Sequence, residues 1–311
     1  MAWSQTIPCV EGEEKMLYVG LDVHKRVCHG TMLDETGGIV KQGRFSNDPH
    51  SLDAFLRDVH GAKVVMEAGY CWQPLYDHLA ARGHDVRLAH PLKTKAIAQA
   101  KVKTDKIDSE TLAHLLRADL VPEAWVPPPE TRALRELVKR RAFLVRLRTK
   151  VKNRIHAELT KRDLPMGTPL FTRKGRDVLQ GLGIDAVSQL LPVLAVLDHQ
   201  IRAVSALIDR TAMGRGDAMR LTTIPGVGRY LALLLVVEIG DVHRFPDAER
   251  LCAYAGLVPS VRQSGNGTVH GAITKAGSQY LRWGLTQAVH AHVRHETRLT
   301  RFYRRLAQKK G

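Results

Sequence analysis

The feature that most constrains this 311-residue chain is a long apolar repeat that begins just after Glu130. Apolar residues recur every three or four positions, as on one face of an α-helix, at Leu134, Leu137, Leu144, Leu147, Val151, Ile155 and Leu159. After a predicted loop at 165–176, a second such repeat runs from Leu190 to Ile208. The two helices are predicted to pair as a long antiparallel coiled coil, or to dimerise, forming an elongated connector over residues 130–212.

The polar face of the first predicted helix carries charge of almost one sign. Ten basic residues lie between its apolar positions, and only Glu136 and Glu158 oppose them. A charged helix face is usually just solvated, but a one-signed face favours contact with a nucleic-acid backbone. The whole chain has a net charge of +16, which also indicates a polyanionic partner. The candidate nucleic-acid-binding residues here are Arg140, Arg141, Arg148 and Lys152.

Composition argues against a membrane or secreted protein. The longest apolar run, from Tyr230 to Ile239, is too short to span a bilayer, and no secretory signal precedes the first domain. The four cysteines are scattered, without the spacing of a metal site. We therefore expect reduced thiols and a cytoplasmic location.

The N-terminal region predicts a mixed α/β domain over residues 16–129, preceded by a flexible lead at 1–15. Apolar segments predict strands, and helical patterns lie between and after them. The predicted strands are 16–23, 27–33, 39–45, 62–66 and 86–89. Strands first, then alternating strands and helices, are typical of a mixed sheet covered by helices.

Four carboxylates fall at informative positions in this domain. Asp22 and Glu67 stand where predicted strands leave the sheet, where ligands gather in α/β folds. Asp105 and Asp108 follow Thr104, a predicted helix N-cap, and share one helix face. Singly, each is more often a solvated residue or a partner of the helix dipole. Together, on separate elements, they meet the requirement for a two-metal phosphodiester site, because Mg²⁺ prefers carboxylate oxygens.

The C-terminal region, residues 213–311, carries two further candidates. The Pro-Gly-Val-Gly turn containing Gly226 and Gly228 feeds an apolar helix, so it predicts either a phosphate-binding helix–hairpin–helix element or a tight interhelical turn. Ser264 lies in a Gly/Asn-rich segment, where serine is usually only a turn former. Its cationic neighbours would also suit a nucleophile that attacks a phosphate. These neighbours are Arg262, His270 and Lys275.

Taken in order, these pieces resemble one family, the insertion-sequence transposases of the IS110 group, which includes the pilin-gene invertases. The resemblance covers nearly all of residues 16–311 and is specific in the order and spacing of its motifs. The first motifs are Gly20-Leu-Asp22-x-x-Lys25, Met66-Glu67-Ala68, Lys103-Thr-Asp105-x-x-Asp108 and Ile224-Pro-Gly-Val-Gly228. The later ones are Phe245, Ala253-Tyr-Ala-Gly-Leu-x-Pro259, Ser264-Gly265 and Thr274-Lys-x-Gly277-x-x-x-Leu-Arg282.

The resemblance implies an RNase-H-like domain of the Holliday-junction-resolvase type, a coiled coil and a mostly α-helical transposase domain. It assigns Asp22, Glu67, Asp105 and Asp108 as ligands of Mg²⁺ (or Mn²⁺) and Ser264 as a nucleophile that forms a 5′-phosphoserine link. It also implies a structured guide RNA, the bridge RNA, that pairs with donor and target DNA. Dimers assembling into tetramers, and association with the bacterial nucleoid during activity, complete the expectation.

Two rival hypotheses remain open on the sequence. In a hydrolytic nuclease of the junction-resolvase type, the four carboxylates would activate water and Ser264 would be structural. In a catalytically silent relative, the chain would bind RNA or DNA without cutting it.

Overall fold

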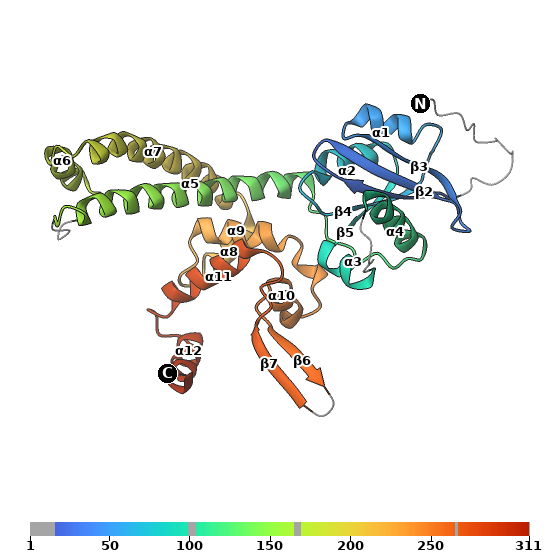
Figure 1. Cartoon of the computed structure of the whole chain (residues 1–311). Helices are drawn as coiled ribbons and strands as arrows, with labels where there is room; N and C mark the ends of the chain where they lie inside the picture. Colours follow the sequence, from blue (N-terminus) through green and yellow to red (C-terminus); the bar gives the residue numbers. More distant parts are fainter. Residues whose placement is uncertain (1–15, 99–103, 165–168, 265–266, 311) are drawn as a thin grey trace. The chain divides into compact units, whose positions relative to one another are not determined.

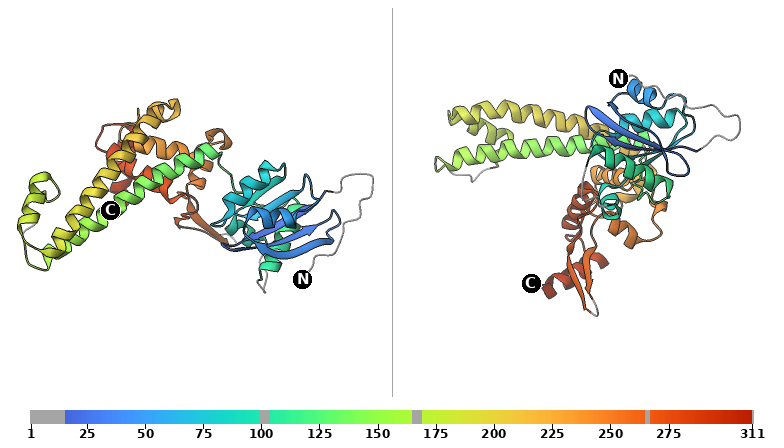
Figure 2. Two further views of the ribbon diagram at one scale, coloured as in Figure 1. Left: turned by 90° about the horizontal axis from the view of Figure 1, so that it is seen from above. Right: turned by 45° about the vertical axis from the view of Figure 1, so that its right-hand side comes forward.

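The computed structural model describes residues 16–98, 104–164, 169–264 and 267–310, without the side chains of Ser264 and Lys310 (Figures 1 and 2). The chain divides into two compact units, residues 1–126 and 127–311. Each unit is described separately below.

A five-stranded mixed sheet forms the centre of the first unit, in the order β3-β2-β1-β4-β5. The strands β1 (Tyr18–Val23), β2 (Val27–Leu33) and β3 (Ile39–Ser46) form an antiparallel meander. The strands β4 (Lys63–Glu67) and β5 (Asp85–Ala89) continue the sheet parallel to β1. The predicted mixed α/β region is therefore confirmed.

Helices cover both faces of this sheet. Residues Val19 and Leu21 of β1 pack with α1 (Pro49–Phe55) and α2 (Trp72–Ala81). The opposite face packs against α4 (Asp105–Arg117), which follows the short α3 (Pro91–Ile97). Because side chains alternate along a strand, the even-numbered residues of β1, Gly20 and Asp22, face α4.

Two long helices and a short one form the first part of the second unit. They are α5 (Pro129–Thr160), α6 (Arg173–Gly181) and α7 (Asp185–Met213). Arg141 of α5 contacts Ser205 of α7, whereas Arg148 contacts Asp198, so the two helices run antiparallel (Figure 1). Antiparallel pairing is thus observed, while a coiled-coil geometry stays a prediction.

The predicted loop at 165–176 is wrong beyond Thr172, because α6 begins at Arg173. The Thr172 hydroxyl accepts a hydrogen bond from the Gly175 amide at 3.2 Å and caps the helix. Gly175 also lies so close to the backbone of Pro169 that a Cβ would come within 2.4 Å of its carbonyl oxygen. Glycine therefore serves close packing here, and its presence does not mark a loop.

The remaining chain is mostly helical, as predicted. Its helices are α8 (Gly216–Leu221), α9 (Arg229–Ile239), η1 (Val242–Arg244), α10 (Ala248–Tyr254), α11 (Gln279–His292) and α12 (Arg298–Lys310). Leu233 and Leu234 of α9 share one buried core with Leu137 of α5, Ile208 of α7 and Leu281 of α11. The N-terminal part of α5 and the C-terminal part of α7 thus pack into the C-terminal core.

The segment around Ser264 is a β-hairpin, where the sequence predicted a loop. Strands β6 (Pro259–Ser264) and β7 (Gly267–Ile273) pair antiparallel and project from the helices of this unit (Figure 1). Glycine and asparagine are concentrated at 265–267, whereas Val261, Val269 and Ile273 favour strands.

Among the described residues, α7 is the one helix with the length and apolar composition of a membrane span. It carries Asp198 within the helix, and its Leu191 and Leu194 are buried.

Candidate functional site

Asp22 occupies the end of β1, on the sheet face that α4 covers. Gly20, two residues earlier on β1, allows the backbone of α4 to approach the strand closely. A Cβ at Gly20 would come 2.1 Å from the Ser109 carbonyl oxygen and 2.5 Å from the Ala113 amide nitrogen. The bare glycine backbone lets α4 rest on β1, with the first turn of α4 beside Asp22.

Asp105 and Asp108 lie in that first turn of α4. Thr104 is the N-cap, as predicted, and its hydroxyl accepts a hydrogen bond from the Ile107 amide at 3.2 Å. His24 Nε2 lies 3.1 Å from Asp22 Oδ2 and 3.4 Å from Asp105 Oδ1. One ligand atom from each of these three side chains falls within 4.8 Å of the others.

Electrostatics make this cluster receptive to a cation. Burial raises the pKa of the Asp22 carboxyl; the adjacent His24 lowers it, and the charges of Asp105 and Asp108 raise it again. The net result is a raised pKa, because an 8 % exposed carboxylate is poorly solvated and faces like charges. A divalent cation would relieve both effects.

Glu67 stands at the end of the neighbouring strand. Leu21 of β1 pairs with Met66 of β4 in parallel register, so Asp22 and Glu67 each follow the last paired residue. Parallel strands in register place equivalent residues on the same face. Glu67 therefore belongs to the same edge of the sheet as Asp22, although the 4.8 Å cluster does not include it.

His24 is the site residue that the sequence analysis missed. The sequence signal was its position two residues beyond Asp22 at a strand end, but a lone exposed histidine there has no obvious partner. Its imidazole nitrogen adds a ligand type that Mn²⁺ accepts alongside oxygen. The donor set of buried carboxylate, exposed carboxylate and imidazole fits a divalent metal.

A polar network behind the carboxylates fixes α4 on the sheet. Ser109 Oγ lies 2.8 Å from Thr31 Oγ1 and 3.3 Å from His29 Nδ1. Gln42 Nε2 donates to Thr31 Oγ1 at 2.9 Å. Burial lowers the pKa of His29, which pairs with Asp22 across β1 and β2. The network sets the rotation of α4 and thereby the direction of its acidic turn.

The hairpin places Ser264 opposite Gly267, at the end of β6, but the serine side chain lies outside the described residues. Arg262 pairs with Val269, and His270 pairs with Val261. Directly paired residues share a face and successive ones alternate, so Arg262 and His270 point to opposite faces. The structure therefore does not place Arg262 and His270, both predicted to stabilise the charge of the phosphate, on one face of the hairpin.

The base of the hairpin is tightly built. A Cβ at Gly256 would come 2.0 Å from the Ala276 carbonyl oxygen, and one at Gly277 would come 2.0 Å from that of Tyr254. Arg282 donates from Nη1 to three carbonyls of this base at 3.0–3.3 Å. Lys275 lies here, at φ 54°, rather than beside Ser264. The glycine and arginine motifs thus orient the hairpin.

The two glycines of the predicted phosphate turn differ. Gly226 has φ 90°, and a Cβ there would come 2.6 Å from the Ala288 carbonyl oxygen, so packing against α11 requires it. Gly228 is the N-cap of α9, without a side-chain cap, and has open space around its Cα. The first amides of a helix have no partner within the helix, so phosphate contact at this helix end stays a prediction.

Three of the four predicted cations on α5 already have protein partners. Arg141 Nε donates to Ser205 Oγ at 2.8 Å, and Arg148 Nη1 donates to Asp198 Oδ1 at 3.3 Å. Lys152 Nζ lies 4.6 Å from the Phe171 ring centroid. Arg140 is exposed. These contacts help hold α5 to its neighbours, and nucleic-acid contact by the four residues stays a prediction.

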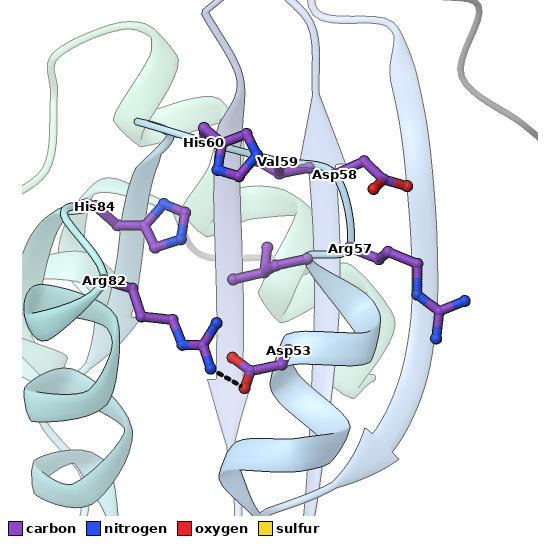
Figure 3. Close-up of a pocket in the computed structure, with 8 residues that line it drawn as sticks. Asp53, Arg57, Asp58, Val59, His60, Arg82 and His84 are labelled. Atoms are coloured by element: carbon purple, nitrogen blue, oxygen red, sulfur yellow. Dashed lines mark hydrogen bonds and ion pairs between the residues drawn. The ribbon is translucent and has the colours of Figure 1, made fainter.

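A separate pocket of about 250 Å³ lies near the beginnings of β4 and β5, away from the carboxylates. Asp53, Arg82, His60 and His84 line it, with an ion pair of 2.6 Å between Arg82 and Asp53 (Figure 3). None of the residues predicted for function lies there.

Carboxylates gathered at the edge of a five-stranded mixed sheet fit the RNase-H-like class of nucleic-acid enzymes. A DEDD-type transposase profile of IS110 elements matches residues 19–162, and the profile described as Transposase IS116/IS110/IS902 family matches residues 218–304. The chain belongs to this transposase family.

Individual relatives agree with this assignment. The chain is 27 % identical to the transposase for insertion sequence element IS1111A of Coxiella burnetii, over 89 % of this chain and 78 % of the relative. It is 26 % identical to the transposase for IS1328 of Yersinia enterocolitica, over 88 % and 83 %. It is 29 % identical to the pilin gene-inverting protein of Moraxella bovis, over 80 % and 74 %.

Proposed function

We propose that this transposase cuts and rejoins DNA strands through the hydroxyl of Ser264, assisted by a divalent cation at Asp22, Glu67, Asp105 and Asp108. The observation that carries the proposal is the convergence of Asp22 and Asp105, from β1 and α4, within 4.8 Å. The net charge of +16 suits binding to a polyanionic substrate. The clustered acidic groups would repel such a substrate, so their role is to bind a cation.

The protein's own residues define how the cation is held. Asp22 is the fixed ligand, because burial and the strand immobilise it, whereas Asp105 comes from the exposed helix turn. His24 would offer its Nε2 as a further ligand, since that atom lies 3.1 Å from Asp22 and 3.4 Å from Asp105. A bound Mg²⁺ or Mn²⁺ supplies Lewis-acid stabilisation for charge developing on the phosphate oxygens.

Ser264 performs the covalent step. Its Oγ attacks the phosphorus and displaces the 3′ oxygen, which leaves a 5′-phosphoserine and a free 3′-hydroxyl. The serine proton passes to the departing oxygen through solvent or a neighbouring base. Attack by a 3′-hydroxyl of the exchanged strand reverses the step and releases Ser264. Arg262, two residues from Ser264 on β6, supplies cationic charge near it, whereas His270 faces the other side of the hairpin and Lys275 lies at its base.

The DNA sites are chosen by a bridge RNA that pairs with donor and target strands. The basic face of α5, with Arg140 exposed on it, and the open helix end at Gly228 support backbone contacts of this kind. Dimers joining into tetramers bring two half-sites together in the bacterial cytoplasm.

A trapping experiment tests the serine step. Purified protein, end-labelled DNA carrying the element's ends, its RNA and Mg²⁺ are mixed and run on a denaturing gel. The wild type is expected to give a covalent protein–DNA band that Ser264→Ala abolishes, while the matched hairpin variant Ser260→Ala retains it. Cleavage that survives Ser264→Ala without an adduct would replace the proposal with the hydrolytic nuclease.

The nuclease alternative has one observation in its favour. The cluster of Asp22, His24 and Asp105 lies wholly within the first unit, so it needs no group from the hairpin to bind a cation. Protein that binds its nucleic acids and Mg²⁺ yet never cuts would instead indicate a silent relative.

A further inference from the structure

A second pocket lies within the C-terminal unit and is lined by residues of α5, the start of α9 and the start of α11. It is a pocket of about 490 Å³, within the range of sites that bind small organic groups. Its walls combine aromatic rings with cations: Arg141, Arg146, Lys150, Tyr230, Tyr280 and Trp283. The three cations belong to the basic face that the sequence predicted to contact nucleic acid, whereas no function was predicted for the three aromatic residues.

The aromatic wall is fixed before any ligand arrives. Tyr230 and Trp283 meet edge to face, with ring centroids 6.2 Å apart. Tyr230 is held by a hydrogen bond from its hydroxyl to the Val138 carbonyl at 3.3 Å. Trp283 nevertheless leaves 44 % of its surface exposed, so a large apolar ring faces the pocket and solvent.

The cations lie directly beside these rings. The Arg141 guanidinium lies 4.1 Å from the Tyr230 ring centroid. Arg146 lies 5.6 Å from the Tyr280 centroid and donates to its hydroxyl at 3.1 Å. Lys150, one helical turn further along α5, is exposed. The charged residues described along the walls are therefore all basic.

A buried acid of α9, Glu238, does not cancel this charge. Glu238 is 3 % exposed, and Lys139 Nζ lies 3.2 Å from its Oε1 and 5.4 Å from the Tyr280 ring centroid. Its other oxygen accepts a hydrogen bond from Ser278 Oγ at 2.6 Å. Glu238 is thus neutralised within the core, and the mouth of the pocket stays positive.

We infer that this pocket binds one unpaired nucleotide of a nucleic-acid strand. A flat ring face and adjacent cations match a base joined to its phosphate, with the base against Trp283 and Tyr280 and the phosphate at Arg146 and Lys150. A base inside a duplex cannot reach such a wall, because both of its faces are already stacked. The inference rests on the proposed function only in taking nucleic acid as the partner.

The test compares single-stranded and duplex oligonucleotides that carry 2-aminopurine, whose fluorescence is quenched by stacking. Wild-type protein is expected to quench the single strand and to bind it. Trp283→Leu and Arg146→Gln should each weaken single-strand binding about 5- to 100-fold and change duplex binding less than about twofold. Arg202→Gln, an exposed arginine on α7, is the matched control and should behave as wild type.

Ribo- and deoxyribo-oligonucleotides identify the source of the strand, since tighter binding of either assigns the nucleotide to RNA or to DNA. Equal losses on single strand and duplex, or no loss, would overturn the inference. A change in subunit stoichiometry with unchanged oligonucleotide affinity would also overturn it. Ser264→Ala keeps the pocket intact, so single-strand binding by that variant separates this inference from the proposed chemistry.

Discussion

Replacing Gly20 with alanine tests how the carboxylate cluster is assembled. The added Cβ would lie 2.1 Å from the Ser109 carbonyl oxygen and 2.5 Å from the Ala113 amide nitrogen. Both atoms belong to the backbone of α4, so no side-chain rotation relieves the overlap. The helix has to withdraw from β1 by roughly 1 Å, and overpacking of this kind costs about 1–3 kcal/mol of the unfolding free energy.

The same withdrawal moves Asp105 away from Asp22, so Mn²⁺ binding should weaken together with stability. Urea unfolding followed by circular dichroism measures the first effect, and calorimetric Mn²⁺ titration of the folded variant measures the second. Gly181→Ala is the control, because no atom lies within 4 Å of a Cβ there. Wild-type stability and wild-type Mn²⁺ affinity in Gly20→Ala would refute the idea that this close contact builds the site.

Three further predictions concern other parts of the chain. Burial alone would raise the pKa of the Asp198 carboxyl, yet two arginine partners hold it below its ordinary value of 3.8. This carboxylate therefore stabilises the fold above its unfolded-state pKa, so Asp198→Asn should cost about 1–3 kcal/mol at pH 7. Urea titrations should show the difference from wild type shrinking as the pH falls through the folded-state pKa; a difference independent of pH contradicts this. Arg140→Gln should reduce the slope of log affinity for DNA against log salt by about 1, whereas Arg148→Gln should mainly lower stability; equal slope changes would rule this out. Burial raises the pKa of the Cys28 thiol to about 12, so iodoacetamide should label exposed Cys252 and spare Cys28 until the chain unfolds, as peptide mass mapping would show.

Local sequence patterns predicted much of the structure of the first unit. Apolar segments predicted its strands, and Thr104 was correctly predicted as the N-cap of a helix whose first turn holds Asp105. The edge position of Asp22 followed from its place at the end of a strand. These features depend on residues near one another in the sequence, which is why composition and spacing reveal them.

Features that depend on distant partners were not predictable. His24 gained its role only when α4 brought Asp105 beside it. Arg148 was predicted to contact nucleic acid because the sequence does not show that Asp198, fifty positions away, is its partner. Gly175 misled in the same way: it marks close backbone packing, which a single sequence does not distinguish from a loop.

The central claim is that the carboxylates of β1 and α4 and the hydroxyl of Ser264 serve one reaction. Mass spectrometry of protease-digested reaction mixtures tests it by locating the nucleotide bound to protein. We predict a nucleotide-bearing peptide modified at Ser264 in the wild type, and none in Asp22→Asn under the same conditions. A nucleotide on a different residue, or undiminished modification in Asp22→Asn, would contradict it.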